Sequence, residues 1–86
     1  MTSEQLQAQI ESWANSKNFT APYGVLTGKS KSKSGRPYLS VTFGRARTLD
    51  AEVQIYSKTF IILRTSRTGS EVYRSVDELQ KALDLL

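Results

Sequence analysis

The chain has 86 residues, a formal net charge of +4, and neither cysteine nor histidine. This length fits one domain, and the missing side chains exclude disulfides, serine–histidine and cysteine–histidine nucleophile systems, and ordinary zinc sites. No apolar run approaches the roughly 18 residues of a membrane span, and the N-terminus lacks the pattern of a signal peptide. We therefore expect a soluble, cytoplasmic protein without a membrane role.

The first expected element is a helix over residues 3–16. Its apolar residues fall at helical spacing and form one stripe: Leu6, Ile10, Trp13 and Ala14. Thr2 precedes the helix and Gln5 follows three positions later, which is the spacing of a capping box. We expect Phe19, just after the helix, to fold back and pack near Trp13.

A sheet of four or five strands is expected over about residues 23–74. The first strand is short, at about 23–27. Residues 28–36 contain only Gly, Ser, Lys and Arg, so we expect a flexible basic loop there. Pro37 begins the second strand, residues 44–47 form a turn or a bulge, and the third strand spans about 48–56. In both strands apolar residues alternate with polar ones, namely Leu39, Val41 and Phe43, then Leu49, Ala51, Val53 and Ile55.

The fourth strand, at 59–65, is apolar on both faces, since Phe60 and Ile62 alternate with Ile61 and Leu63. Such a strand is usually covered on both sides. The sequence leaves open whether both helices share a face of the sheet. The fourth strand suggests that one helix covers each face, or that another subunit covers one face. Ile61 and Leu63 are core residues if the N-terminal helix packs on them, and an interaction patch if it does not.

The chain closes with a short strand and a helix. A loop over 66–70 with Gly69 in a left-handed conformation leads to a fifth strand at 71–74. Ser75 and Glu78 then form a capping box for a helix over about 76–86. The apolar stripe of this helix consists of Val76, Leu79, Ala82, Leu83 and Leu86.

These elements predict a single α+β domain spanning residues 1–86, with an antiparallel meander between an N-terminal and a C-terminal helix. In outline, a short sheet followed by one helix resembles the DNA-binding domains of plant ethylene-response factors and of some phage integrases. Those domains read DNA with a three-stranded sheet. The small, basic, cysteine-free chain also looks like many phage proteins. No motif matches, so no residue role is transferred.

The positive charge is concentrated in one segment. Residues 28–48 contain no acidic residue and six cations: Lys29, Lys31, Lys33, Arg36, Arg45 and Arg47. Flexible cations beside hydroxyls and free backbone N–H groups suit phosphate contacts, which are independent of sequence. We therefore expect a small, non-enzymatic protein that binds DNA or RNA through its phosphate backbone. Alternatively, the segment is a solvated hairpin whose lysines protect a sheet edge from aggregation.

Aromatic residues extend the same hypothesis. Tyr38 follows the basic loop on the polar face of its strand, and Tyr56 and Gln54 are candidates for the same side. A tyrosine beside arginine suits base stacking, although cross-strand packing explains these residues equally well. Arg64, Arg67 and Arg74 either extend the basic surface or pair with nearby acids.

Two further hypotheses follow from the sequence. The domain is alternatively a protein-binding or regulatory module, which self-associates or docks an acidic partner through its basic loop. Asp50, Glu52 and Lys58 also loosely match a metal-dependent nuclease pattern, but their spacing departs from it. We therefore expect no enzymatic activity, no metal site and no cofactor.

Overall fold

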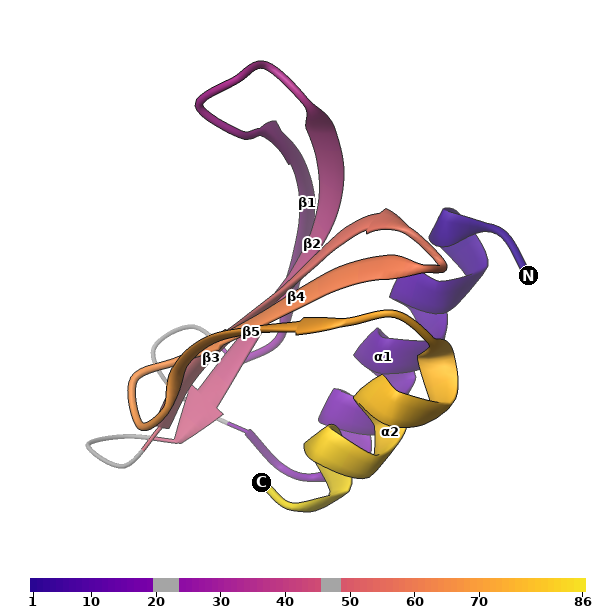
Figure 1. Ribbon diagram of the computed structural model, residues 1–86. Coiled ribbons are helices and arrows are strands. Elements are labelled where there is room, and N and C mark those ends of the chain that lie inside the picture. Colours follow the sequence, from indigo (N-terminus) through magenta and orange to yellow (C-terminus); the bar gives the residue numbers. More distant parts are fainter. Residues whose placement is uncertain (20–23, 46–48) are drawn as a thin grey trace.

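The computed structural model describes residues 1–19, 24–45 and 49–86. Along the chain lie α1 (Ser3–Ser16), β1 (Leu26–Lys31), β2 (Pro37–Arg45), β3 (Leu49–Ser57), β4 (Phe60–Thr65), β5 (Gly69–Tyr73) and α2 (Val76–Asp84). The strands form one antiparallel sheet in the order β1-β2-β3-β4-β5 (Figure 1). The predicted α+β meander between two helices is confirmed.

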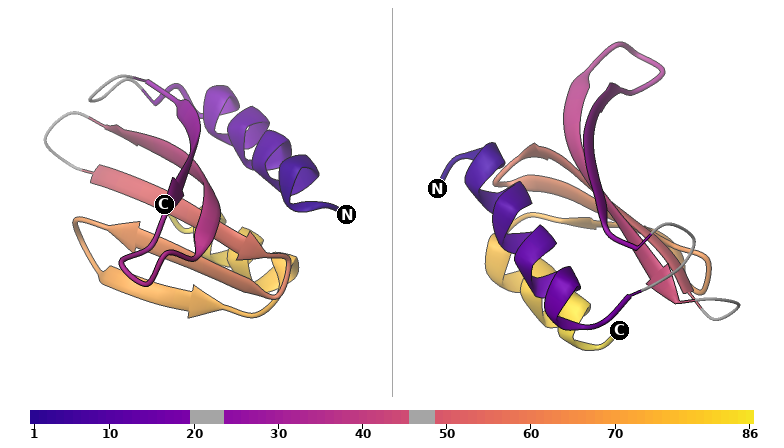
Figure 2. Two further views of the ribbon diagram at one scale, coloured as in Figure 1. Left: turned by 90° about the horizontal axis from the view of Figure 1, so that it is seen from above. Right: turned by 180° about the vertical axis from the view of Figure 1, so that it is seen from behind.

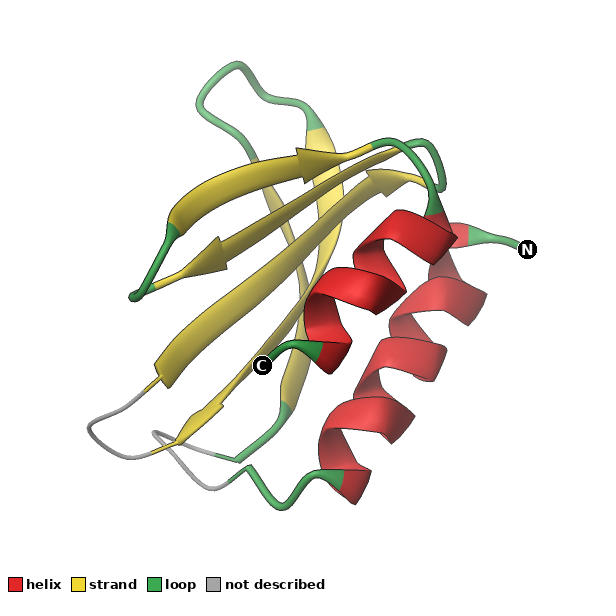
Figure 3. Cartoon of the chain, turned by 60° about the horizontal axis from the view of Figure 1, so that its bottom comes forward, coloured by secondary structure: helices red, strands yellow, loops and turns green. Residues whose placement is uncertain are grey.

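Both helices pack on the same face of the sheet, side by side (Figure 3). Leu6 and Ile10 of α1 and Leu79 and Leu83 of α2 belong to one buried cluster with the inward residues of β2, β3 and β4. The question that the sequence leaves open is thus answered: the two helices share one face, and the arrangement with one helix on each face, which the fourth strand suggested, does not occur. Ile61 and Leu63 lie in this core, 0% and 5% exposed, so they are core residues and not an interaction patch, and Leu63 lines a cavity together with Ala82 of α2.

The opposite face carries no helix in the described part of the chain, and we call it the open face. One line of cross-strand neighbours marks it across all five strands: Gly28, Ser40, Gln54, Ile62 and Val72. Phe60 and Ile62 therefore form the second apolar side of β4. Both are only half-buried, because their neighbours on the open face shield them in place of a second helix.

The basic loop is shorter than predicted. Residues 28–31 belong to β1, where Lys29 pairs with Leu39 and Lys31 with Pro37. Pairing with the regular strand β2 supplies backbone partners that the Gly/Ser/Lys sequence does not favour by itself. The turn closes over residues 32–36, where the Ser32 N–H donates to the Arg36 carbonyl oxygen at 2.9 Å. Tyr23, the expected start of the strand, lies outside the described residues.

The expected bulge or turn at 44–47 is also displaced. Gly44 and Arg45 continue β2 and pair with Asp50 and Leu49, while residues 46 and 47 lie outside the described part. Figure 2 shows the β1–β2 hairpin curving away from the helices on the side of the open face. Its tip therefore projects from the rest of the domain.

The N-terminal caps of both helices involve the residues that the sequence predicts. The Thr2 hydroxyl accepts from the Gln5 backbone N–H at 3.1 Å, and the Gln5 side chain accepts from the Thr2 N–H at 2.8 Å. This confirms the first capping box. At α2 only half the expected box forms, because Glu78 accepts from the backbone N–H of Arg74 and not from that of Ser75.

An aromatic group closes the core at the end of α1. Trp13 lies 5.7 Å from Phe19 and 5.5 Å from Phe43, measured between ring centres. Asn18 takes a positive φ of 56° between the helix and Phe19, a left-handed conformation that asparagine tolerates after a helix. The predicted return of Phe19 onto Trp13 is confirmed. Neither α1 nor α2, the helices of the described residues, is long and apolar enough to cross a membrane.

Candidate nucleic-acid interface

Four of the predicted site cations lie on the β1–β2 hairpin. Lys29 and Lys31 pair with Leu39 and Pro37 and therefore project on the helix side of the sheet, opposite the open face. Lys29 and Lys31 belong to β1, Lys33 lies in the turn and Arg36 immediately precedes β2. All four side chains are exposed. Among the described residues, the ion pair is formed by Arg64 and Glu52. No described carboxylate therefore forms an ion pair with the hairpin cations.

The remaining two predicted cations do not join this group in the described structure. Arg45 ends the nine-residue strand that Pro37 begins, which places it roughly 25–30 Å from Arg36 along the strand. It donates to the Leu86 carbonyl oxygen at 3.1 Å, and its guanidinium carbon lies 4.8 Å from the ring centre of Phe19. Arg45 thus ties the C-terminus to the core. Arg47 lies outside the described residues.

Two cations outside the basic segment lie at the hairpin end of the sheet. Lys58 occupies the turn between β3 and β4, and Arg74 follows the last residue of β5. Antiparallel pairing brings these positions to the end of the sheet where Arg36 enters β2. The sequence indicated Arg74 as one possible extension of the basic surface. It gave no signal for Lys58 as part of this group.

Three rings on the open face form what we call the aromatic cluster: Tyr38, Tyr56 and Phe60. Ring centres lie 5.2 Å apart for Tyr38 and Tyr56, and 5.4 Å apart for Tyr56 and Phe60. Ile55 pairs with Ile61, so Tyr56 and Phe60 are the next positions of the two strands and lie near each other, although the register shifts there and pairs Ser57 with Phe60. The sequence indicates Tyr38 and Tyr56 as candidates for base stacking, but it gives no such indication for Phe60.

Two guanidinium groups flank the aromatic cluster. The guanidinium carbon of Arg36 lies 5.1 Å from the centre of Tyr56 and 4.9 Å from that of Phe60. Arg74 lies 5.0 Å from the centre of the same Phe60 ring. These separations fall within the range of cation–π attraction. The open face therefore presents aromatic and cationic groups together at its hairpin end.

A row of polar side chains leads away from the cluster along β3. The Tyr56 hydroxyl donates to Gln54 Oε1 at 3.4 Å, and Gln54 Nε2 donates to Glu52 Oε1 at 2.8 Å. Glu52 also meets Arg64 Nη1 at 3.9 Å. Glu52 is thus partly neutralised within the protein, whereas the hairpin cations are not.

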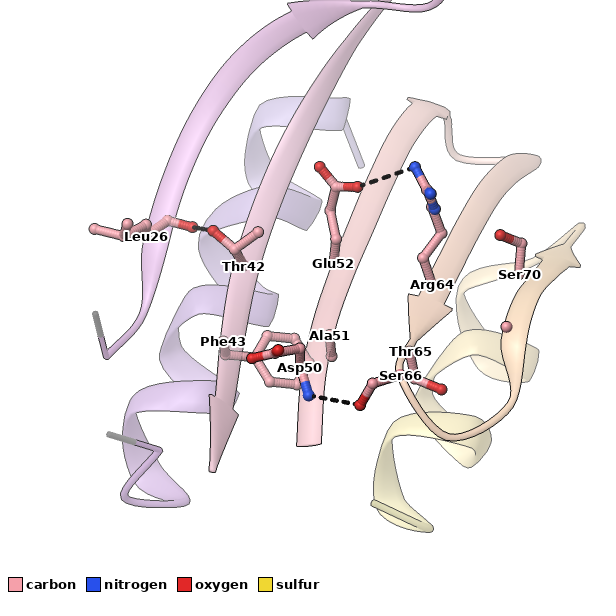
Figure 4. Close-up of a pocket in the computed structure, with 11 residues that line it drawn as sticks. Leu26, Thr42, Phe43, Asp50, Ala51, Glu52, Arg64, Thr65, Ser66 and Ser70 are labelled. Carbon is pink, nitrogen blue, oxygen red and sulfur yellow. Dashed lines mark hydrogen bonds and ion pairs between the residues drawn. The ribbon is translucent and has the colours of Figure 1, made fainter. Parts of the chain in front are cut away.

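The far end of the open face is hollowed. A pocket of about 630 Å³ is lined by residues from all five strands, among them Leu26 at one edge and Ser70 at the other (Figure 4). Residues of both edge strands line one pocket, so the open face is concave. Within it the Ser66 hydroxyl accepts from the Asp50 backbone N–H at 3.1 Å.

The nuclease-like arrangement is not assembled in the described residues. Asp50 and Glu52 line the pocket, but Lys58 lies beyond the other end of β3, about 25 Å from Asp50 along the strand. In the described ranges no three side chains of the metal-binding types gather closely enough to hold an ion.

Comparisons with known proteins do not extend this picture. No protein-family model, curated protein or solved structure matches the chain. The chemistry of the hairpin and of the open face is therefore the basis for inferring a function.

Proposed function

We propose that this protein is a small, non-enzymatic, intracellular accessory protein that binds nucleic acid through its β1–β2 hairpin. The main supporting observation is the group of four exposed cations, Lys29, Lys31, Lys33 and Arg36, with no ion pair to a described carboxylate. Unneutralised cations on a projecting hairpin can approach a phosphate backbone without first breaking internal contacts. The binding would not depend on sequence.

The proposed phosphate contacts predict how strongly the affinity depends on salt concentration. Each phosphate neutralised on duplex DNA contributes about −0.9 to the slope of log K against log salt, and about −0.7 on a single strand. Four hairpin cations therefore predict a slope between about −3 and −4. The six cations of the basic segment would have given a steeper slope of roughly −5 on duplex DNA, but the structure separates Arg45 from the group.

The test compares two triple variants that remove the same charge. Lys29→Gln/Lys31→Gln/Lys33→Gln removes three cations from the hairpin. Lys17→Gln/Arg67→Gln/Lys81→Gln removes three exposed cations that lie after α1, in the β4–β5 turn and on α2. Fluorescence anisotropy with labelled oligonucleotides at 50 and 200 mM salt measures affinity and slope.

We expect the hairpin variant to lose affinity for every sequence and to reduce the magnitude of the slope by about 2 to 3. The control variant should stay close to the unmodified protein. Equal losses in the two variants would mean that only net charge matters, and tight binding by the hairpin variant would exclude the proposal.

A second candidate function is a protein-binding or regulatory role, by self-association or with an acidic partner. Val72 of β5 is 49% exposed and neighbours the half-buried Ile62 on the open face. Analytical ultracentrifugation distinguishes the two functions. A stable dimer or hetero-complex that involves Val72, with no affinity for nucleic acid, would favour this second role.

A further inference from the structure

We infer that the open face recognises single-stranded nucleic acid, with the aromatic cluster stacking on bases while the hairpin holds phosphates. This inference rests on the proposed function and narrows its ligand. The half-buried rings of Tyr38, Tyr56 and Phe60 supply the stacking surface. Base–aromatic stacking tolerates every base, so it suits a protein without sequence preference.

The aromatic cluster is not part of the hydrophobic core. The protein's other aromatic group, Trp13, Phe19 and Phe43, packs under α1. The aromatic cluster instead lies on the face that no helix covers within the described residues, and the pocket lined from all five strands lies further along the same face. Aromatic rings beside arginines on an open sheet face are a general means of binding single strands.

The two flanking arginines supply charge complementarity. Because each guanidinium carbon lies about 5 Å from the Phe60 ring centre, Arg36 and Arg74 are within about 10 Å of each other, comparable to the Debye length at 0.1 M salt. An anion beside the Phe60 ring would be attracted by both guanidinium groups. Guanidinium planes also stack on bases, so either an arginine or a ring can meet a base.

A duplex fits this arrangement less well than a single strand. Paired bases are stacked on each other inside a duplex, so their faces are not accessible to side chains. A duplex can meet the hairpin cations through its phosphates but cannot use the aromatic cluster. A single strand uses both.

Two carboxylates on the open face limit where the phosphates of a bound strand can lie. Asp50 and Glu52 line the pocket beyond the cluster, and only Glu52 has a recorded cationic partner among the described residues. Phosphates are therefore expected on the hairpin side of the cluster. The bases are expected to lie over the rings, toward the middle of the face.

The decisive probes differ only in their bases. A 12-nucleotide oligothymidylate and a 12-nucleotide strand of abasic sites have the same phosphates, and a 12-base-pair duplex hides its bases. We expect the protein to bind oligothymidylate about 5- to 150-fold more tightly than the abasic strand, corresponding to one stacked base. Oligouridylate is expected to behave like oligothymidylate. This ratio needs no variant, so it remains informative if a variant fails to fold.

Variants then test whether the aromatic cluster causes the preference for oligothymidylate over the abasic strand. Tyr56→Leu/Phe60→Leu keeps apolar volume but removes two of the three rings, and it should clearly lower the ratio between thymidylate and abasic strands. Tyr73→Leu removes a half-buried ring paired with Ile61 on the helix side and should keep the ratio. The hairpin triple variant should weaken both strands equally and keep the ratio too.

The outcomes separate this inference from the proposed function. Equal affinity for all three probes, lost in the hairpin variant, would retain phosphate binding and overturn base stacking. A preference for thymidylate that is unchanged in Tyr56→Leu/Phe60→Leu would overturn the assignment to the aromatic cluster. No binding to any probe would overturn both.

Discussion

The guanidinium of Arg36 lies over the ring of Phe60, with its central carbon 4.9 Å from the ring centre. This contact joins the end of the hairpin turn to the first residue of β4, which is separated from Arg36 by the whole of β2 and β3. It also orients the guanidinium toward the open face. The same side chain therefore belongs both to the hairpin cations and to the surroundings of the aromatic cluster.

Arg36→Gln should weaken nucleic-acid binding and reduce the magnitude of the salt slope by about 1, because one phosphate contact is lost. Arg36→Lys keeps the charge but loses the planar stacking surface, so its slope should be unchanged. Arg36→Gln should also lose about 0.5–1 kcal/mol of cation–π stabilisation at this exposed site. Anisotropy titrations at several salt concentrations give the slope, and Arg67→Gln in the β4–β5 turn is the matched control. An unchanged slope in Arg36→Gln would remove Arg36 from the interface.

The two aromatic groups should differ sharply in their contribution to stability. Phe43 is 1% exposed and contacts Trp13 and Phe19, so Phe43→Ala should cost about 3–5 kcal/mol of unfolding free energy. Phe60 is half-buried on the open face, and Phe60→Leu should cost less than about 1.5 kcal/mol. Urea unfolding followed by circular dichroism measures both. A cost for Phe60→Leu as large as that for Phe43→Ala would identify the aromatic cluster as core.

Much of the fold could be predicted because its signals are local. The capping pair Thr2–Gln5 and the alternation of β2 and β3 each follow from residues within one element. The strand β1 was misplaced, because its pairing depends on β2 and not on its own Gly/Ser/Lys sequence. The side of the sheet on which α2 packs depends on sheet twist and connection geometry, which local patterns do not encode.

The candidate site could be predicted only in part for a related reason. The hairpin cations lie close together in the sequence, so the local concentration of positive charge predicts them. Phe60 lies beside Tyr56 because Ile55 pairs with Ile61, and this register between β3 and β4 is not encoded within either strand alone. Arg74 reaches the same ring from β5. Such contacts between strands become visible only once the sheet is assembled.

Gly35 should control the geometry of the hairpin turn. Its φ is +86°, a left-handed conformation, and its N–H donates to the Ser32 carbonyl oxygen at 2.9 Å. Nothing lies within 4 Å of an added Cβ atom, so the cost of Gly35→Ala would be backbone strain of about 1–2 kcal/mol. Gly35→Asn is the control, because asparagine tolerates this conformation. Hydrogen exchange at residues 30–38 should rise in the alanine variant only, and equal exchange in both would contradict the argument.

Glu52→Gln should strengthen binding of a single strand. The change removes one negative charge from the open face and frees Arg64, whose side chain is 59% exposed, from its partner at 3.9 Å. Through water, a charge near the ligand changes affinity by about twofold at low salt. The unfolding free energy should change by less than about 1 kcal/mol, as for other surface pairs. Glu11→Gln on α1 is the control. Unchanged binding by Glu52→Gln would place the nucleic acid away from this part of the face, and weaker binding would contradict the expected repulsion.

Tyr73 should make the fold sensitive to strong alkali. Burial raises the pKa of its phenol from 10.0 to about 12, with further contributions from its hydrogen bond to Glu71 and from the charges of Glu71 and Glu78. In the unfolded chain the phenol titrates near 10, so between pH 10 and 12 the unfolded state loses this proton while the folded state keeps it. The stabilisation is therefore complete below pH 10 and is lost as the pH rises through about 12.

The matched variant is Tyr73→Phe, which keeps the ring and removes the titrating group together with the 2.6 Å hydrogen bond to Glu71. Urea midpoints of both proteins, measured from pH 9 to 12, isolate the effect of this one phenol, because the other tyrosines and the lysines are common to both. The unmodified protein should lose stability faster than Tyr73→Phe over this range. A constant difference between the two midpoints would show that Tyr73 titrates alike in the folded and unfolded states, and that its contact with Glu71 does not hold the proton.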